Sequence, residues 1–151
     1  IEDNVKGNFQ AIAINKIQVG KNVNLSYPSA LVINENKDML TEEAQIVIDE
    51  FSTIKGIILF KTNKDLLNSF ATHLKILKNT KILGEVYCEG NFELKGEVWG
   101  SVYTHQFVSN TAGTIFINHL YNAKISAKSF PAFYSGLLFE NQTKSIMKWL
   151  Y

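Results

Sequence analysis

The fold is decided by residues 82–104, which have the sequence ILGEVYCEGNFELKGEVWGSVYT. Every second residue from Ile82 to Val102 is apolar or glycine, and the residues between them are mostly charged, polar or aromatic. Strict alternation of this kind predicts β-structure with one face in a core and the other in water. One straight strand of this length would span more than roughly 70 Å, far beyond a normal strand. We therefore expect the chain to bend while keeping the same side chains inward.

Glycines at positions 84, 90, 96 and 100 fall on the inward-facing set. Glycine has no Cβ, so these are the positions where a corner forms most easily. A hairpin meander would usually contain Asn-Gly or Asp-Gly turns, and the stretch has neither. The pattern favours a mainly β fold, a parallel β-solenoid whose short strands turn corners around one core.

A short unit, aliphatic-x-Gly-x-aliphatic, recurs along the chain and supports a solenoid. It occupies residues 54–58, 82–86 and 98–102, and a degenerate copy with one extra residue falls at 120–125. The irregular spacing predicts coils of roughly 20 residues with corner loops of variable length. Weaker alternation runs through the N-terminal third. We therefore expect a single domain over residues 1–151, with residues 1–10 loosely held.

Two segments depart from the β pattern. Apolar residues at helical spacing predict a helical insertion over about residues 65–78. Residues 131–151 are rich in aromatic side chains, and Ile146, Trp149 and Leu150 fall on one helical face. The last coil of a solenoid exposes core and strand edges. We therefore expect residues 131–151 to form a helical, aromatic cap.

The composition argues against several classes of partner. The chain is 46% hydrophobic and 19% charged with a net charge of +1, as expected for a folded protein without a strong field toward nucleic acid or membrane. All the basic residues are lysine, and the absence of arginine lowers the odds of nucleotide or nucleic-acid recognition. Cys88 is the one cysteine, and His73, His105 and His119 lack metal-binding spacing. We expect no nucleic-acid partner, no metal and no cofactor.

Four glutamates, Glu85, Glu89, Glu93 and Glu97, recur every four residues in the outward-facing set. Carboxylates roughly 5 to 9.5 Å apart are able to hydrolyse glycosidic bonds. The stretch lacks the aspartate clusters or essential basic residue usual in polysaccharide-cleaving β-helices, so we expect a solvated face. No nucleophile elbow, phosphate-binding loop or dinucleotide fingerprint occurs, and we predict no catalytic residues.

Three aromatic residues on the outward face, Tyr87, Trp99 and Tyr103, are the candidate binding residues. Exposed aromatics on a flat β surface stack on sugar rings or anchor a protein partner. The alternative is that a loop, the inserted helix or the C-terminal tail covers them and makes them part of the core.

The motif Ile82-x-Gly84-x-Val86, followed by residues 90–102 (GNFELKGEVWGSV), resembles a bactofilin repeat. The resemblance covers about residues 81–126. It implies a compact right-handed β-helix and end-to-end polymerisation without nucleotide. Irregular coil spacing, the helical insertion and the heavy aromatic tail depart from that family, and a tail that caps the end would block growth through it.

The function expected from these observations is that of a non-enzymatic structural or scaffold module of a bacterial cell. Its partner would be itself or another envelope or cytoskeletal protein, contacted by the solenoid ends or the aromatic face. The alternative is a carbohydrate-binding or carbohydrate-modifying β-helix; a left-handed hexapeptide-type acyltransferase is a third, weaker option. The chain begins at Ile1 without methionine. We therefore expect a removed signal or anchor segment, with envelope association favoured over a free cytoplasmic protein.

Overall fold

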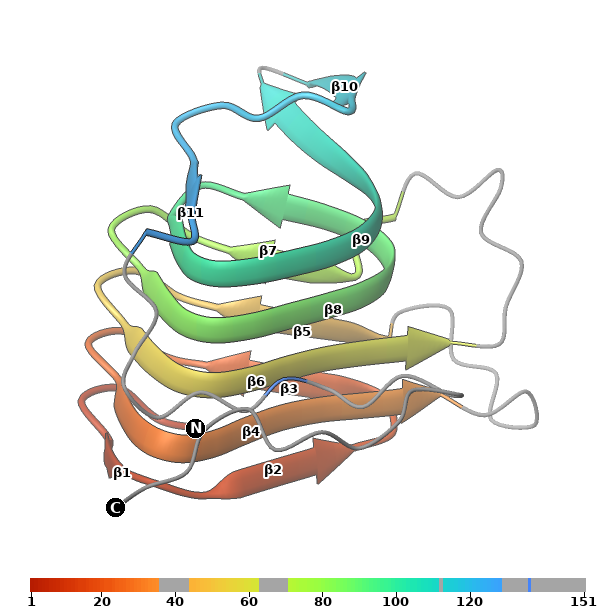
Figure 1. Cartoon of the computed structure of the whole chain (residues 1–151). Helices are drawn as coiled ribbons and strands as arrows, with labels where there is room; N and C mark the ends of the chain where they lie inside the picture. Colours follow the sequence, from red (N-terminus) through yellow and green to blue (C-terminus); the bar gives the residue numbers. More distant parts are fainter. Residues whose placement is uncertain (36–43, 63–70, 112, 129–135, 137–151) are drawn as a thin grey trace.

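The chain is mainly β, with parallel strands in a strongly curled sheet, as in the β-solenoid class (Figure 1). This computed structural model describes residues 1–35, 44–62, 71–111, 113–128 and 136. Among the described residues, the strand pairings are parallel except that of β10 with β9, so residues 82–104 form parallel strands and not a hairpin meander. The strands are Lys6–Gly7 (β1), Gln10–Ala13 (β2), Lys16–Val19 (β3), Asn24–Glu35 (β4), Gln45–Ile48 (β5), Thr53–Thr62 (β6), Leu74–Ile76 (β7), Lys81–Leu94 (β8), Glu97–Thr111 (β9), Thr114–Ile117 (β10) and Lys124–Ser126 (β11).

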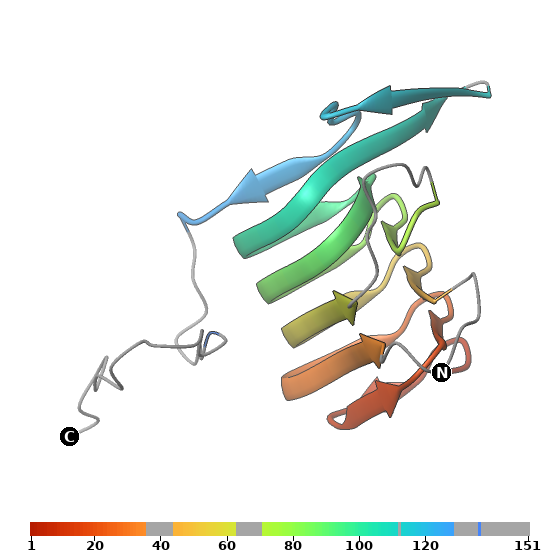
Figure 2. The ribbon, with the colours of Figure 1, turned by 90° about the vertical axis from the view of Figure 1, so that its right-hand side faces the viewer.

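The chain winds repeatedly around one axis, and we call each complete turn a pass. Each pass pairs through parallel strands with the one before it (Figure 2). A pass has three sides. Side A contains β1, β11 and the first residues of the long strands; side B contains β2 and the later residues of the long strands; side C contains β3, β5, β7 and the end of β8. The residues that open side A in successive passes are Lys6, Asn24, Thr53, Lys81, Glu97 and Lys124.

Residues 82–104 bend as predicted. Residues 81–88 of β8 pair with β6, whereas residues 92–94 of the same strand pair with β7 on another side. The bend keeps the alternation intact, because Ile82, Val86 and Phe92 are all fully buried. One continuous strand therefore serves all three sides of the curled sheet.

The repeated glycine unit forms the corner between sides A and B. Gly56, Gly84 and Gly100 are register partners in successive passes, with φ of 144°, 152° and 156°. A Cβ on Gly84 would overlap the carbonyl oxygen of Gly56, and one on Gly100 would overlap that of Gly84. Glycine is needed here because the backbones of adjacent passes approach too closely for any side chain. The degenerate copy at 120–125 is out of register, since Ile125 pairs with Val98 at the start of the unit.

The core is a set of columns of aliphatic and aromatic side chains that face inward from all three sides. On side B, Leu31, Ile58 and Val86 lie in register and are fully buried. On side C, Ile46, Leu74 and Phe92 do the same. β-Branched and aromatic residues suit such stacked, half-buried surfaces.

The corner between sides C and A uses residues in the left-handed conformation. These residues precede the first residue of side A by two positions, with φ between 54° and 64°; they are Asn4, Asn22, Phe51, Asn79 and Asn122. Asparagine tolerates this conformation better than other residues with side chains. The pass that begins at Glu97 lacks such a residue because its turn, Lys95 and Gly96, is two residues shorter than the turn before Lys81.

The structure bears on the predicted helix and on the N-terminal residues. The predicted helix over 65–78 is wrong where it is described, because Leu74–Ile76 form β7 and pair with β5 and β8; residues 65–70 lie outside the described residues. Leu74 and Ile76 are buried, Lys75 lies between them, and pairing on both sides of this short strand outweighed the helical spacing. Within residues 1–10, which the sequence predicts to be loosely held, the Ile1 ammonium donates to Gln18 O at 2.8 Å and the Asn4 amide donates to Lys21 O at 2.8 Å. The predicted cap at 131–151 lies outside the described residues except for position 136.

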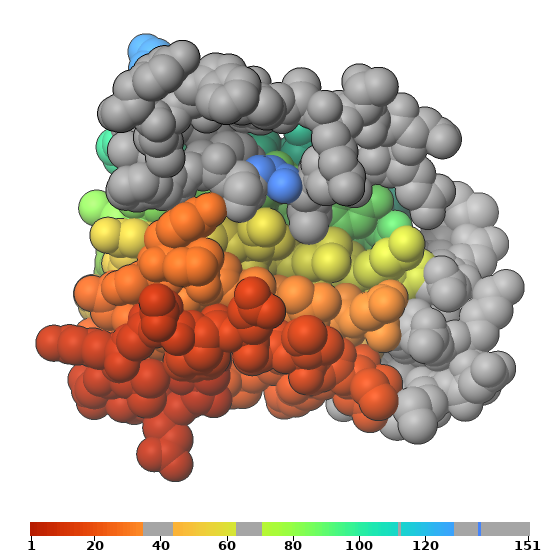
Figure 3. Space-filling view, turned by 60° about the horizontal axis from the view of Figure 1, so that its bottom comes forward, coloured from red at the N-terminus to blue at the C-terminus, as the bar shows by residue number. Residues whose placement is uncertain are grey.

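The two ends of the stack differ. The first pass, red in Figure 3, forms the N-terminal end and exposes Ile12 (74%) and Ile14 (47%). At the other end β9 leaves the stack and pairs with β10, so this hairpin splays away from the passes below it (Figure 2). The hairpin turn uses Gly113 with φ of 83°.

Candidate functional site

Tyr87 and Tyr103 lie side by side on the outer face of side B. They are register partners in β8 and β9, their ring centroids are 6.4 Å apart, and the Tyr103 side chain is 44% exposed. The structure therefore brings together two of the three candidate binding residues.

A small pocket of about 280 Å³ opens beside the two tyrosines and is lined by Tyr87, Cys88, Glu89, Tyr103, Thr104 and His105. The Tyr87 hydroxyl donates to Glu89 Oε1 at 3.0 Å, while Glu89 Oε2 accepts from the Thr62 amide at 2.9 Å. Burial, followed by the hydrogen bond and the charge of Glu89, raises the pKa of Tyr87. Aromatic faces next to a fixed carboxylate and a hydroxyl are the groups that hold a sugar ring.

Trp99 does not belong to this pocket. It lies on side A, separated from Tyr103 by the Gly100 corner, and its Nε1 donates to Glu97 Oε2 at 2.8 Å. The Lys124 ammonium lies 4.9 Å from the centroid of the Trp99 ring. The alternation correctly places all three aromatics outward, but it does not reveal that a corner divides them.

The prediction of a solvated glutamate face is wrong for two of its four members. Glu85 and Glu93 are only 3% and 2% exposed. Glu93 Oε1 lies 2.8 Å from Lys95 Nζ and Oε2 lies 3.1 Å from Lys75 Nζ. Burial alone would raise the pKa of Glu93, but the two lysines outweigh it and hold the pKa below its ordinary value. The buried carboxylate is therefore paired with two partly exposed lysines.

His73 is a buried, hydrogen-bonded residue at the start of side C, not a member of a helix. Its Nδ1 accepts from the Asn91 amide at 3.1 Å, and its ring lies 5.2 Å from that of Phe60. Gly90 lies against the imidazole, since a Cβ there would come within 2.6 Å of the ring. Within the described residues, no group of three histidine, cysteine, aspartate or glutamate side chains is placed to hold a metal ion.

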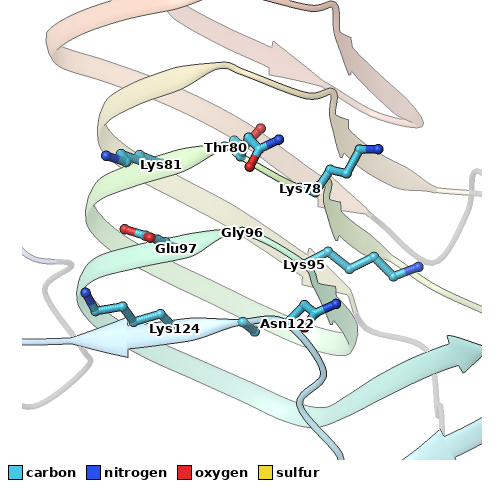
Figure 4. Close-up of a pocket in the computed structure, with 10 residues that line it drawn as sticks. Lys78, Thr80, Lys81, Lys95, Gly96, Glu97, Asn122 and Lys124 are labelled. Carbon is cyan, nitrogen blue, oxygen red and sulfur yellow. The ribbon is translucent and has the colours of Figure 1, made fainter.

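Sequence reasoning missed a lysine-rich groove at the corner between sides C and A (Figure 4). The groove has a volume of about 700 Å³. It is lined by residues 78–81, 95–97 and 122–124, which include Lys78, Lys81, Lys95 and Lys124. The signal in the sequence was the shortened turn at Lys95 and Gly96, which becomes visible only once the passes are aligned.

The C-terminal end of the stack exposes an apolar surface that the sequence did not single out. Its large side chains are 39–52% exposed and belong to β10, the segment after it and β11; they are Ile115, Phe116, Ile117, Leu120, Tyr121 and Ile125. We call this set the apolar end. All four residues of β10 are exposed, so its apolar side chains meet water on both faces of the strand, and exposed apolar side chains in this number are typical of contact surfaces.

Comparisons with family models, with curated proteins and with solved structures gave no match to this chain. Over the ranges that the structure describes, the chain forms no helix with the length and hydrophobicity needed to cross a bilayer.

Proposed function

We propose that the chain is a short right-handed β-solenoid that acts as a non-enzymatic structural module and associates through its C-terminal end. The winding in Figure 1 supports the handedness, because the long strands run left to right in front and the shorter strands return behind them while the chain rises. Parallel pairing of successive passes, with register shifts between Leu25 and Ser29 and between Cys88 and Asn91, supports the solenoid itself.

The observation that carries the proposed function is the apolar end. Phe116 and Tyr121 are 46% and 52% exposed, and together with Thr111 and His119 they line a hollow of about 260 Å³. The end of a strand stack also presents unpaired backbone groups, which invite another chain. Burying this surface against a second copy would remove several large apolar side chains from water.

The resemblance of residues 81–126 to bactofilins agrees with association through solenoid ends, and it is the basis for proposing a bacterial, envelope- or cytoskeleton-associated scaffold. The partner would be a second copy or another scaffold protein.

Light scattering after size exclusion, over a range of concentrations, tests this proposal. We expect the molar mass of the wild type to rise with concentration, and that of Phe116→Glu to stay at the monomer value at every concentration. Phe51→Glu is the matched control, because Phe51 is exposed to 55% at a corner of another pass. A wild type that stays monomeric throughout, or an equal loss of association in both variants, would contradict the proposal.

A second candidate function, carbohydrate binding, is favoured by the Tyr87–Tyr103 pocket and its fixed Glu89 carboxylate. Titration calorimetry with neutral oligosaccharides tests it. Binding that is lost in Tyr103→Ala and kept in Phe116→Glu would support a sugar site on side B, whereas binding unaffected by Tyr103→Ala would exclude this pocket as the site.

A further inference from the structure

The lysine-rich groove exists because one turn of the stack is short. Four residues connect Ile76 to Lys81, but only two, Lys95 and Gly96, connect Leu94 to Glu97 at the equivalent place. Gly96 fits directly against the preceding turn, since a Cβ there would overlap the Thr80 carbonyl oxygen. The short turn therefore sits back between two longer ones and leaves a hollow of about 700 Å³.

Ammonium groups flank this hollow on both sides (Figure 4). Lys78 and Lys95 extend to one side, where Lys78 lies 3.3 Å from Glu50 and Lys95 lies 2.8 Å from Glu93. Lys81 and Lys124 extend to the other side, with Glu97 between them in register. The two have no ion pair with any described residue, and both are exposed.

The side of the groove that bears Lys81 and Lys124 is partly preorganised. The Glu97 carboxylate accepts from the Trp99 indole, and the Trp99 ring in turn lies beneath the Lys124 ammonium. Such a cation–π contact favours one placement of a flexible lysine. Lys78 and Lys95 are paired with Glu50 and Glu93, so the charge that the groove offers to a ligand comes from Lys81 and Lys124, with Glu97 between them.

We propose that this groove binds an acidic polysaccharide, a linear sugar chain with a carboxylate or sulfate on its residues. Lys81 and Lys124 are two strands apart, about 10 Å along the stack. Two unpaired ammonium groups at this separation suit a polymer that carries more than one anionic group. Among the described residues the lining contains no aromatic side chain on which a base could stack, and the chain has no arginine, so this part of the groove lacks the usual means of holding a nucleic acid. The site is separate from the apolar end and from the Tyr87–Tyr103 pocket.

Titration calorimetry with tetragalacturonate at low ionic strength tests this site. We expect the wild type to bind and the double variant Lys81→Gln/Lys124→Gln to bind about tenfold more weakly, because two exposed charge contacts are lost. The fluorescence of Trp99 gives an independent readout, because a ligand that engages Lys124 alters the cation above the ring.

The matched control is Lys6→Gln/Lys16→Gln, which removes the same charge from two exposed lysines in the first pass, away from the groove. This control should bind tetragalacturonate as the wild type does, and urea unfolding should show that both double variants are folded. The proposal is overturned if the wild type does not bind, if the control loses as much affinity as the groove variant, or if a short oligothymidylate binds as tightly as the sugar acid.

Discussion

Replacing Gly84 by alanine tests the close stacking of successive passes. The alanine Cβ would overlap the Gly56 carbonyl oxygen, a backbone atom that no rotamer change can move aside. The φ of 152° is also one that residues with side chains rarely adopt. Backbone strain of this kind costs about 1–3 kcal/mol. Forcing extra volume into a packed site costs about 1–3 kcal/mol more. We therefore expect Gly84→Ala to lower the free energy of unfolding by about 4 kcal/mol, a large part of the roughly 5–15 kcal/mol typical of a domain.

Equilibrium unfolding in urea, followed by tryptophan fluorescence, measures this loss. Two control variants separate the causes. Gly113→Ala has a φ of 83° but nothing within 4 Å of the added Cβ, so it should cost only about 1–2 kcal/mol. Gly7→Ala has ordinary φ and its nearest neighbour at 4.0 Å, so it should change stability by less than about 0.5 kcal/mol. A Gly84→Ala protein no less stable than Gly113→Ala would refute the argument that the passes stack too closely for a side chain.

Three further predictions concern buried polar groups. The pKa of Glu93 is lowered in the folded chain, so its contribution to stability is present above the ordinary carboxyl pKa and is lost as the pH falls through the folded-state value. In Glu93→Gln, the free energy of unfolding should therefore depend less steeply on pH over this acidic range. Burial raises the pKa of Cys88 to about 12, so the native thiol should resist iodoacetamide at pH 8 and react once urea unfolds the chain. Ionisation of that thiol in the unfolded chain should lower stability above pH 9, by up to about 1.4 kcal/mol per pH unit. The buried Thr80 hydroxyl donates to Asp49 O at 2.7 Å, so Thr80→Val should cost about 1–3 kcal/mol in urea unfolding, whereas exposed Thr114→Val should cost almost nothing.

The alternation in residues 82–104 was sufficient to predict parallel passes, an inward core and glycine corners. Those features depend on side-chain period and on the missing Cβ, and both are local properties of the chain. The helical spacing around Leu74 misled the prediction because strand β7 is only three residues long, too short for a period of two to be recognised. Pairing with β5 and β8 decided its conformation.

The candidate site was predictable only in part. Outward alternation identified Tyr87 and Tyr103, but their contact depends on the register between two passes. The same alternation placed Glu93 in water, whereas Lys75 from the neighbouring pass and Lys95 from the following turn surround its carboxylate. The lysine groove depends on a difference in length between stacked turns. Such differences become apparent only when residues 16 or 28 positions apart are known to be neighbours.

The register of the passes also determines how the molecule would respond to mechanical tension. Its interstrand hydrogen bonds run along the stack, so pulling the two ends apart loads them one pass after another and not all together. Thr53 and Lys81 are equivalent positions 28 residues apart, whereas Lys81 and Glu97 are only 16 apart. Peeling off one pass would therefore release about 95 Å of chain at the first site and about 55 Å at the second. A force–extension trace of this protein would show steps of unequal length, in an order that reports the end from which it unravels.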